Sequence, residues 1–395
     1  MHYIPGTTLL GSLAAAHRIL RPEQQEQFAP FFLDDQIFYP CLYPAVFNES
    51  GLDFDTSNLP VMPLPKTAQS CKRFSDFKPA PDEDPDVKGH GIRDNLLDWA
   101  AFSLLSDEQQ SIPALLAPLD KHAYCASCHQ TMDRVSGYYR CASSNPQQKM
   151  KAQTRTRLQT RTGINRSWGV AEEGILYNRE VFDEDMNFWG AVILPDGLVD
   201  DFTDFIKEAN EEGVICIGTG RTRGLGQIEI EEPGEVKRED ISRFRLRLSN
   251  FDEALKQRAQ VADVKEVHNF YFAITLHSAT ILCDPFLRYH KTLDAATLRS
   301  LLKNVPEDVN FTQIYHSTGI QRITGWNDLW GTPRTNDYAI EMGSTFFFAC
   351  SHKLDDDTLL NDLYTLEETG IGRRCSEGFG RICISDPFHL QGEQL

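Results

Sequence analysis

The stretch "GTGRTRGLGQIEI" at residues 218–230 returns in altered form as "GRRCSEGFGRICI" at residues 372–384. We refer to residues 218–226 as the first corner and to residues 372–380 as the second corner. Aligned without gaps, the stretches share three glycines and two isoleucines, paired as Gly218 with Gly372, Gly224 with Gly378, Gly226 with Gly380, Ile228 with Ile382 and Ile230 with Ile384. Self-similarity of this kind indicates an internal duplication.

The segments that precede the two corners are also alike. Before the first corner, "NFWGAVILPD" at residues 187–196 has the pattern of a strand, and "GLVDDFTDFIKEANEEG" at residues 197–213 has helical spacing. Before the second corner, "STFFFACS" at residues 344–351 predicts a strand and "DDDTLLNDLYTLEETG" at residues 355–370 a helix. Strand, helix, glycine corner and strand therefore occur twice, which predicts an α+β fold with two related halves.

The second half has further predicted elements. A long strand is expected at residues 267–283, with its aromatic and aliphatic side chains on one face, and a helix at residues 293–305. Residues 318–343 have the pattern of a hairpin. The alternation in "ISRFRLRLS" at residues 241–249 indicates one further strand.

The corners are not nucleotide-binding loops of the known kinds, because a predicted strand follows the glycines where a dinucleotide or P-loop motif needs a helix. Two interpretations remain. Each corner is a tight turn that needs positive φ, or its bare amides and flanking guanidinium groups hold a phosphate chain. The second interpretation makes RNA-binding candidates of Gly218, Arg221, Arg223, Gly224, Gly226, Gly372, Arg373, Arg374, Gly378 and Gly380.

The chain carries a formal net charge of −18, which argues against general binding to nucleic acid but leaves room for a local basic groove. The segment "KMKAQTRTRLQTRTGINR" at residues 149–166 holds six basic residues and no acid. It is a solvated basic loop or an RNA-backbone contact, with candidates Arg155, Arg157, Arg161 and Arg166. Tyr138, Tyr139 and Trp168 flank it and would be available to stack on unpaired bases.

Ten cysteines in 395 residues are too few for a disulfide scaffold, and "CASC" places Cys125 and Cys128 in a CxxC pair. Cys71, His90 and Cys141 are candidates to complete a four-ligand structural Zn²⁺ site, with His129 as a substitute. The alternative is a set of free thiols in a reducing compartment. A catalytic zinc is disfavoured, because no His-Glu-x-x-His pattern accompanies the pair.

Several segments resemble the RAMP superfamily of CRISPR proteins, and within it the two-fold subunit of type III-D effector complexes. "YIPGTTLLGSLAAA" at residues 3–16 is similar to the family's first helix. The more specific segments are "PLPKTAQSCKRF", "HGIRDNLLDWAAFSL", "CASCHQTMDRVSGYY" and "GINRSWGVAEEGILYNREVF", at residues 63–74, 90–104, 125–139 and 163–182.

The resemblance implies two RNA-recognition-motif, or ferredoxin-like, folds in tandem at residues 1–240 and 241–395. The first would carry a zinc-stapled insertion at about residues 60–145 and the basic segment 149–166, near the guide RNA. The resemblance also favours Cys71 and His90 as zinc ligands, with Cys141 as the alternative. The family's fold opens with a strand before its first helix, so we expect an earlier start or another segment in that sheet position.

The function implied by the resemblance is binding of crRNA, with the 5′ repeat-derived tag capped, in antiviral defence. The implied partners are crRNA, other RAMP-family proteins and the large subunit of a type III effector complex. One alternative is a metal-independent endoribonuclease that matures pre-crRNA, for which His2, His17, His268, His277 and His316 are unassigned. Another is a zinc-stapled protein adaptor. The chain has no membrane-spanning run and no convincing signal peptide, so we expect a cytoplasmic protein.

Overall fold

The computed structural model describes most of the chain. The described residues are 3–46, 60–78, 89–105, 124–141, 149–165, 167–231, 234–236, 238–262, 264, 268–327, 331–354 and 357–390. Helices and strands are mixed along these residues, so the chain is α+β, as the sequence predicts. No helix within the described ranges combines the length and apolar character that crossing a bilayer requires.

The second half is built on a four-stranded antiparallel sheet with the order β12-β17-β11-β18. The strands are β11 (Phe270–Leu276), β12 (Phe311–Ser317), β17 (Thr345–Cys350) and β18 (Ile382–Ile384). Helix α7 (Ala295–Leu301) follows β11, and helix α8 (Asp357–Thr369) follows β17. This is the β-α-β-β-α-β order of a ferredoxin-like unit, and it fits the strand and helix expectations for this half.

The sheet of the second half is covered on both faces. One face of β11 packs with α7 and α8 through a core that includes Phe272, Phe348 and Leu363. The other face packs on α6 (Ile241–Val261) and α3 (Leu96–Ser103). All seven residues of β11 are buried, and not only the alternate ones that the sequence analysis placed inward.

The strand expected at residues 241–249 is wrong, because these residues open helix α6. Asp240 caps it, its carboxylate accepting a hydrogen bond of 2.9 Å from the backbone N–H of Arg243. Phe244, Leu248 and Phe251 repeat at intervals of four and three and are fully buried. This helical period extends through the whole segment and outweighs the short local alternation.

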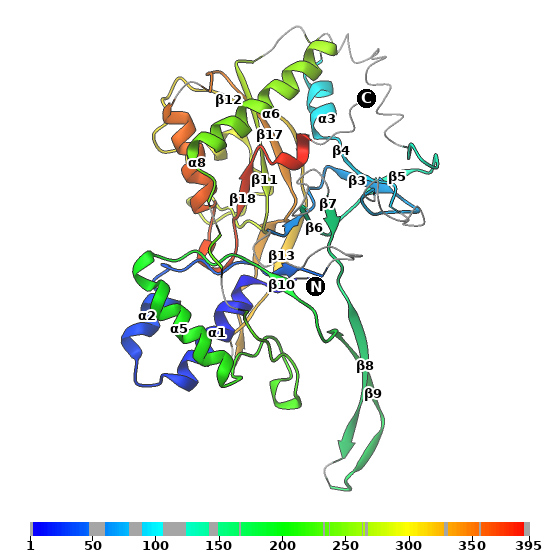
Figure 1. Cartoon of the computed structure of the whole chain (residues 1–395), viewed down its shortest axis with the longest axis vertical. Helices are drawn as coiled ribbons and strands as arrows, with labels where there is room; N and C mark the ends of the chain where they lie inside the picture. Colours follow the sequence, from blue (N-terminus) through cyan, green and yellow to red (C-terminus); the bar gives the residue numbers. More distant parts are fainter. Residues whose placement is uncertain are drawn as a thin grey trace.

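The first half has its own helices and core. Helices α1 (Gly6–Leu20), α2 (Gln25–Phe32) and α5 (Val199–Glu211) lie together in the lower part of Figure 1. Their apolar faces form one cluster of buried side chains, including Leu9, Leu13, Phe31, Phe202, Phe205 and Ile206. The predicted helix at residues 197–213 and the helix of residues 3–16 are therefore confirmed as α5 and α1.

The strands expected around the first corner are much shorter than predicted. Strand β10 (Phe188–Trp189) pairs with β1 (Tyr43–Pro44), and beyond it Ile193 forms an isolated bridge with Phe38. Cys216 and Gln227 form another isolated bridge. The described residues of the first half therefore hold pieces of a sheet, which are separated by a gap.

The described residues of the segment 62–151, which belongs to the first half in sequence, form two small sheets. Strands β2 (Met62–Pro63), β6 (Tyr138–Cys141) and β7 (Lys149–Lys151) make one, and β4 (Ile92–Asp94), β3 (Ala68–Cys71) and β5 (Met132–Arg134) make the other. Helix α3 anchors the segment on the second half, where Arg258 of α6 lies 2.6 Å from the Asp98 carboxylate.

Two hairpins project from these layers. Strands β8 (Thr156–Asn165) and β9 (Val170–Phe182) form a long arm that extends away from the body in Figure 1. The hairpin predicted at residues 318–343 is confirmed, with the pairs β13 (Ile320–Ile323) with β16 (Asp337–Ile340) and β14 (Trp326–Asn327) with β15 (Thr332–Pro333).

Candidate nucleic-acid interface and metal site

The two corners have the same backbone fold. Each contains a single 3-10 turn, η2 (Arg221–Arg223) in the first and η3 (Cys375–Glu377) in the second. Four backbone hydrogen bonds between equivalent positions close each corner, at 2.7–3.4 Å in the first and 2.9–3.4 Å in the second. All the aligned glycines have positive φ. The duplication seen in the sequence is thus present at the level of individual hydrogen bonds.

The last glycine of each corner is required by close packing as well as by φ. A Cβ on Gly226 would lie 2.0 Å from the carbonyl oxygen of Ile217, and a Cβ on Gly380 would lie 2.0 Å from that of Ile371. In both cases the chain entering the corner passes directly against the chain leaving it. Glycine at this position serves the turn itself, whatever the corner binds.

The first corner is open to solvent. A Cβ on Gly218 or on Gly224 would meet no atom within 4 Å. The side chains of Arg221 and Arg223 are exposed. The backbone amides and the two guanidinium groups of this corner are therefore accessible to a ligand.

The first corner also contacts the β8–β9 arm. The guanidinium of Arg179 in β9 donates a hydrogen bond of 2.7 Å to the carbonyl oxygen of Thr219. Arg223 donates one of 3.2 Å to the hydroxyl of Tyr177, also in β9. These contacts join two segments that the sequence analysis selected separately, and nothing in the sequence indicated that they would meet.

The second corner is covered by the first half of the chain. A Cβ on Gly378 would lie 2.9 Å from the carbonyl oxygen of Tyr39, and a Cβ on Gly6 would lie 2.5 Å from that of Glu377. The backbone N–H of Tyr39 donates a hydrogen bond of 2.9 Å to the carbonyl of Ser376. The second corner is consequently part of the joint between the two halves.

Arg374 in the second corner is held by carboxylates. Its guanidinium lies 2.7 Å from Asp337 and 2.8 Å from Glu377, and it stacks over the ring of Phe379 at 4.9 Å. Burial alone would raise the pKa of Glu377, but the nearby guanidinium groups outweigh it and lower that pKa. Gly372 and Arg373, by contrast, are exposed at the edge of this corner.

The β8–β9 arm has one face rich in arginine. Residues that alternate along a strand share a face, so Arg157 and Arg161 lie on the same side of β8. Arg179 joins this face because β9 pairs with β8 in the register Gln159↔Arg179. Arg157 lies 2.5 Å from the Glu184 carboxylate and 4.0 Å from that of Asp183, so part of its charge is neutralised.

The other residues that were predicted to contact RNA near the arm differ in their exposure. Arg155 is exposed just before β8, and Trp168 at the tip is 79% exposed. Arg166 lies outside the described residues. Tyr138 and Tyr139 are 7% and 1% exposed, so the expectation that they stack on RNA bases is wrong. Their rings pack inside the protein because β6 is the central strand of its small sheet.

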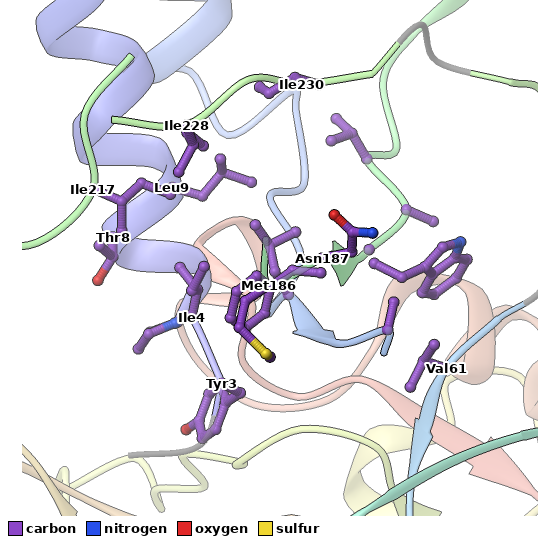
Figure 2. A pocket seen from close by; sticks show the side chains of 18 of the residues that line it. Tyr3, Ile4, Thr8, Leu9, Val61, Met186, Asn187, Ile217, Ile228 and Ile230 are labelled. Carbon is purple, nitrogen blue, oxygen red and sulfur yellow. The ribbon is translucent and has the colours of Figure 1, made fainter. Parts of the chain in front are cut away.

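One large cavity, of about 2170 Å³, is lined by the arm, by the helices and first corner of the first half, and by residues of the second half such as His277, Glu367 and Arg381. The first corner lines it with Gly218, Arg223, Gly224 and Gly226, and the arm lines it with Arg157, Arg161 and Arg179. Figure 2 shows a more apolar part of its wall, where Leu9 of α1 lies close to Ile217 and Ile228. Gly372, Arg373, Arg374, Gly378 and Gly380 of the second corner are not among the residues that line this cavity, whereas Arg381, which directly follows the corner, is one of them.

The predicted metal ligands come together in the segment 62–151, beside the sheet of β3, β4 and β5. Cys71 ends β3, His90 lies just before β4, and Cys125 and Cys128 belong to a tight turn before β5. The four ligand atoms all lie within 4.8 Å of one another. Sγ of Cys71 is 3.6 Å from Sγ of Cys128, and Sγ of Cys125 is 3.4 Å from Nδ1 of His90. Cys141 and His129 are outside this group.

The arrangement fits a closed tetrahedral metal site. Zn–S bonds of about 2.3 Å in a tetrahedron require ligand atoms about 3.8 Å apart, close to the separations seen. Burial opposes ionisation of Cys125, but backbone hydrogen bonds from Cys128 and Ser127 outweigh it and lower its pKa to about 6. A thiol that ionises readily is suited to bind a metal ion. This group could therefore hold one.

A second cluster of titratable side chains lies where the segment meets the second half. The ring of His277 lies 2.7 Å from the carboxylate of Asp386. The ring of His389 lies 3.0 Å from the carboxylate of Asp94. Burial would raise the pKa of Asp386, but the two histidines lower it. No sequence motif marks this cluster, because its members are brought together only by tertiary packing.

The sequence pattern of the RAMP superfamily matches residues 1–229 of the chain. That match spans more than half of the 395 residues, so the chain belongs to the RAMP superfamily. The resemblance seen in the sequence is confirmed at this level.

Two solved structures are similar to the chain. One is the type III-B Cmr-beta complex bound to cognate target RNA, with 10% identity, a TM-score of 0.35, and coverage of 88% of this chain and 76% of that one. The other is the Csm3–Csm4 subcomplex of a type III-A CRISPR–Cas interference complex, with 12% identity, a TM-score of 0.33, and coverage of 87% and 86%. No curated protein matches the chain.

Proposed function

We propose that this RAMP protein is a crRNA-binding subunit of a type III CRISPR effector complex, of the III-D subtype, which caps the 5′ repeat-derived tag. Superfamily membership supports the choice of ligand class. The observation that carries the proposal is the meeting of the first corner with the arginine face of the arm, through the hydrogen bond from Arg179 to Thr219. Other RAMP-family proteins and a large subunit would be its neighbours.

In this proposal one RNA strand follows the cavity between the arm and the first corner. Backbone amides near Gly218 and Gly224 approach the phosphates, because no side chain at these positions blocks them. Arg161, Arg179 and Arg223 present guanidinium groups along the same path, and a guanidinium fork matches phosphate oxygens in geometry. The protein's work is positioning, in which phosphate contacts set the register of the RNA.

The second corner would contribute less to RNA binding. Only Gly372 and Arg373 are exposed there, so contact with RNA would occur at that edge. Gly378 is buried in the joint and Gly380 is buried within the second half, and the carboxylates of Asp337 and Glu377 compensate Arg374. We also propose that residues 1–240 and 241–395 are tandem ferredoxin-like folds.

The four-ligand group would hold Zn²⁺ as a structural ion. Cys71, His90, Cys125 and Cys128 would be its ligands, and the ion would tie the turn before β5 to β3. This matters because the two small sheets bury few large side chains of their own.

The RNA proposal is tested by binding of a labelled crRNA across a series of salt concentrations. Replacing both Arg161 and Arg223, which line the cavity, with Ala should weaken binding and lower the salt slope by roughly 1.4, since each single-strand phosphate contact contributes about 0.7. The matched control is Arg243→Ala, an exposed arginine on α6 outside the cavity. Equal affinity and slope in the double variant and the control would contradict the proposal.

The zinc proposal is tested by measuring metal in the purified protein. We expect about one zinc ion per chain. Cys71→Ser should lose it and Cys141→Ser should keep it, because Cys141 lies outside the ligand group. Loss of zinc from both variants, or from neither, would be inconsistent with this ligand set.

A further inference from the structure

A second set of potential metal ligands lies at the edge of the sheet of the second half. It consists of His277, Cys383 and Asp386, and we refer to these three residues as the edge triad. Their ligand atoms all lie within 4.8 Å of one another. Imidazole nitrogen, thiolate sulfur and carboxylate oxygen are the ligand atoms from which protein zinc sites are built. The composition of the edge triad is therefore that of a metal site.

The pairing of β11 with β18 brings the edge triad together (Figure 1). Cys383 in β18 pairs with Thr275 in β11. His277 follows β11 directly, and its backbone N–H donates a hydrogen bond of 2.8 Å to the carbonyl of Arg381. Residues that alternate along a strand share a face, so His277 lies on the same face as Thr275 and Cys383. Asp386 comes shortly after β18, and its carboxylate accepts a hydrogen bond of 2.7 Å from the His277 ring.

The edge triad is buried on one side and open on the other. Asp386 is 1% exposed and Cys383 is 7% exposed. The residues His277 and Cys383 nevertheless both line the large cavity. A metal ion held by three protein ligands at such a wall keeps a fourth position for water or another small ligand. The group of four ligands in the segment 62–151, by contrast, leaves no position open to an outside ligand.

The charges beside the edge triad are compatible with a cation. The guanidinium of Arg247 lies 3.2 Å from Sγ of Cys383. That guanidinium is itself paired with two carboxylates, 2.7 Å from Glu367 and 3.3 Å from Glu239. Because its charge is compensated in this way, Arg247 does not leave an excess of positive charge at the site. The carboxylate of Asp386 then remains to balance an added metal ion.

The thiol determines which metal ions fit the edge triad. Burial raises the pKa of Cys383 well above its usual value, and the nearby Arg247 offsets this only in part. A metal ion that bonds strongly to sulfur, such as Zn²⁺ or Co²⁺, would displace the thiol proton into solvent. Mg²⁺ prefers oxygen ligands and would not. The ion would also replace the hydrogen bond between His277 and Asp386, with the imidazole proton carried on the other ring nitrogen.

We propose that the edge triad binds a second metal ion of the Zn²⁺ class through His277, Cys383 and Asp386, and that the fourth position of this ion holds an exchangeable ligand in the cavity. The edge triad binds the ion more weakly than the four-ligand group, because it has one ligand fewer and its buried thiol must lose a proton. It is therefore filled when metal is supplied, after the four-ligand group. This inference does not depend on RNA binding.

The experiment adds Co²⁺ to the full chain while the four-ligand group holds Zn²⁺, which thiolate-rich sites select. Co²⁺ reports a thiolate ligand by a charge-transfer band in the near ultraviolet, and four-coordination by intense visible bands. We expect about one equivalent of Co²⁺ to bind with both signals. Sodium azide should then shift the visible bands, because it replaces the exchangeable ligand.

Two pairs of variants test the ligands. His277→Gln removes a ligand but keeps a polar group beside Asp386, and should weaken Co²⁺ binding at least about ten-fold. His316→Gln, at an exposed histidine in β12, should leave binding unchanged. Cys383→Ser should abolish the charge-transfer band, whereas Cys350→Ser, at a buried cysteine in β17, should keep it.

Circular dichroism checks that each variant folds, and the His277→Gln pair decides the outcome if Cys383→Ser does not. Four results would overturn the proposal. These are no uptake of Co²⁺ beyond the four-ligand group, uptake without the thiolate band, no response of the visible bands to azide, and equal affinity of the wild type and His277→Gln.

Discussion

The first and second corners are two copies of one backbone structure in opposite surroundings. Both close with the same hydrogen bonds and both need glycine where the chain passes itself. The first corner is exposed beside an arginine-rich arm, whereas the second is covered by Tyr39 and Gly6 from the first half. The duplicated sequence therefore specifies the shape of the turn, and its neighbours decide whether the turn is available to a ligand.

The sharpest test of this difference uses the equivalent residues Gly378 and Gly224, which both have positive φ. Alanine at either position adds the same kind of backbone strain, of about 1 kcal/mol. Only at Gly378 would the new Cβ also approach another segment, lying 2.9 Å from the carbonyl of Tyr39. We expect Gly378→Ala to lower the free energy of unfolding by roughly 2 kcal/mol more than Gly224→Ala. Equal decreases in the free energy of unfolding of the two variants, measured by urea denaturation, would contradict this difference between the corners.

Replacing an arginine of the second corner should reduce the stability of the protein, whereas replacing one of the first corner should reduce its affinity for RNA. Arg374→Ala leaves Asp337 and Glu377 without their shared cation at a site where the guanidinium is only 21% exposed. We expect it to reduce the free energy of unfolding by roughly 1–2 kcal/mol, less than for a fully buried pair. Arg223→Ala should change stability by less than about 0.5 kcal/mol and instead weaken crRNA binding. Thermal unfolding and RNA titration of both variants measure the two effects, and the reverse assignment would contradict the comparison.

Lowering the pH should destabilise the second corner more than the first. The pKa of Glu377 is lowered in the folded protein, so its contribution to stability is fully present above the ordinary value of 4.5 and is lost as pH falls below it. The equivalent position in the first corner is Arg223, which does not titrate in this range. Glu377→Gln should therefore flatten the dependence of stability on pH below about 4.5 by a small amount. An unchanged slope in acid denaturation would show that the carboxylate is not stabilised there.

The sequence predicted the repeated elements well where each element carries its own signal. Helices α5 and α8 follow from their apolar spacing, α1 was expected from the resemblance to the superfamily, and the corners follow from glycines at fixed offsets. The grouping of Cys71, His90, Cys125 and Cys128 was also anticipated, in part from the resemblance to the superfamily. Short motifs of this kind predict the local backbone conformation without information from distant segments.

The remaining features depend on contacts between distant segments. A local alternation suggested a strand at residues 241–249, although the longer helical period prevails in α6. The burial of Tyr138 and Tyr139 and the enclosure of Gly378 by Tyr39 have no local signature. The short strands of the first half have a physical cause of the same kind, since the neighbour that β11 provides to β17 and β18 has no described counterpart there.

The most direct test of the account is photo-crosslinking of the full chain to a crRNA that carries 4-thiouridine near its 5′ end, followed by mass spectrometry of the linked peptides. We expect crosslinks in residues 218–226 and in the β8–β9 arm, with none in the covered residues 374–380. Crosslinks that fall on residues 374–380 and spare the first corner would contradict the division of roles between the two corners.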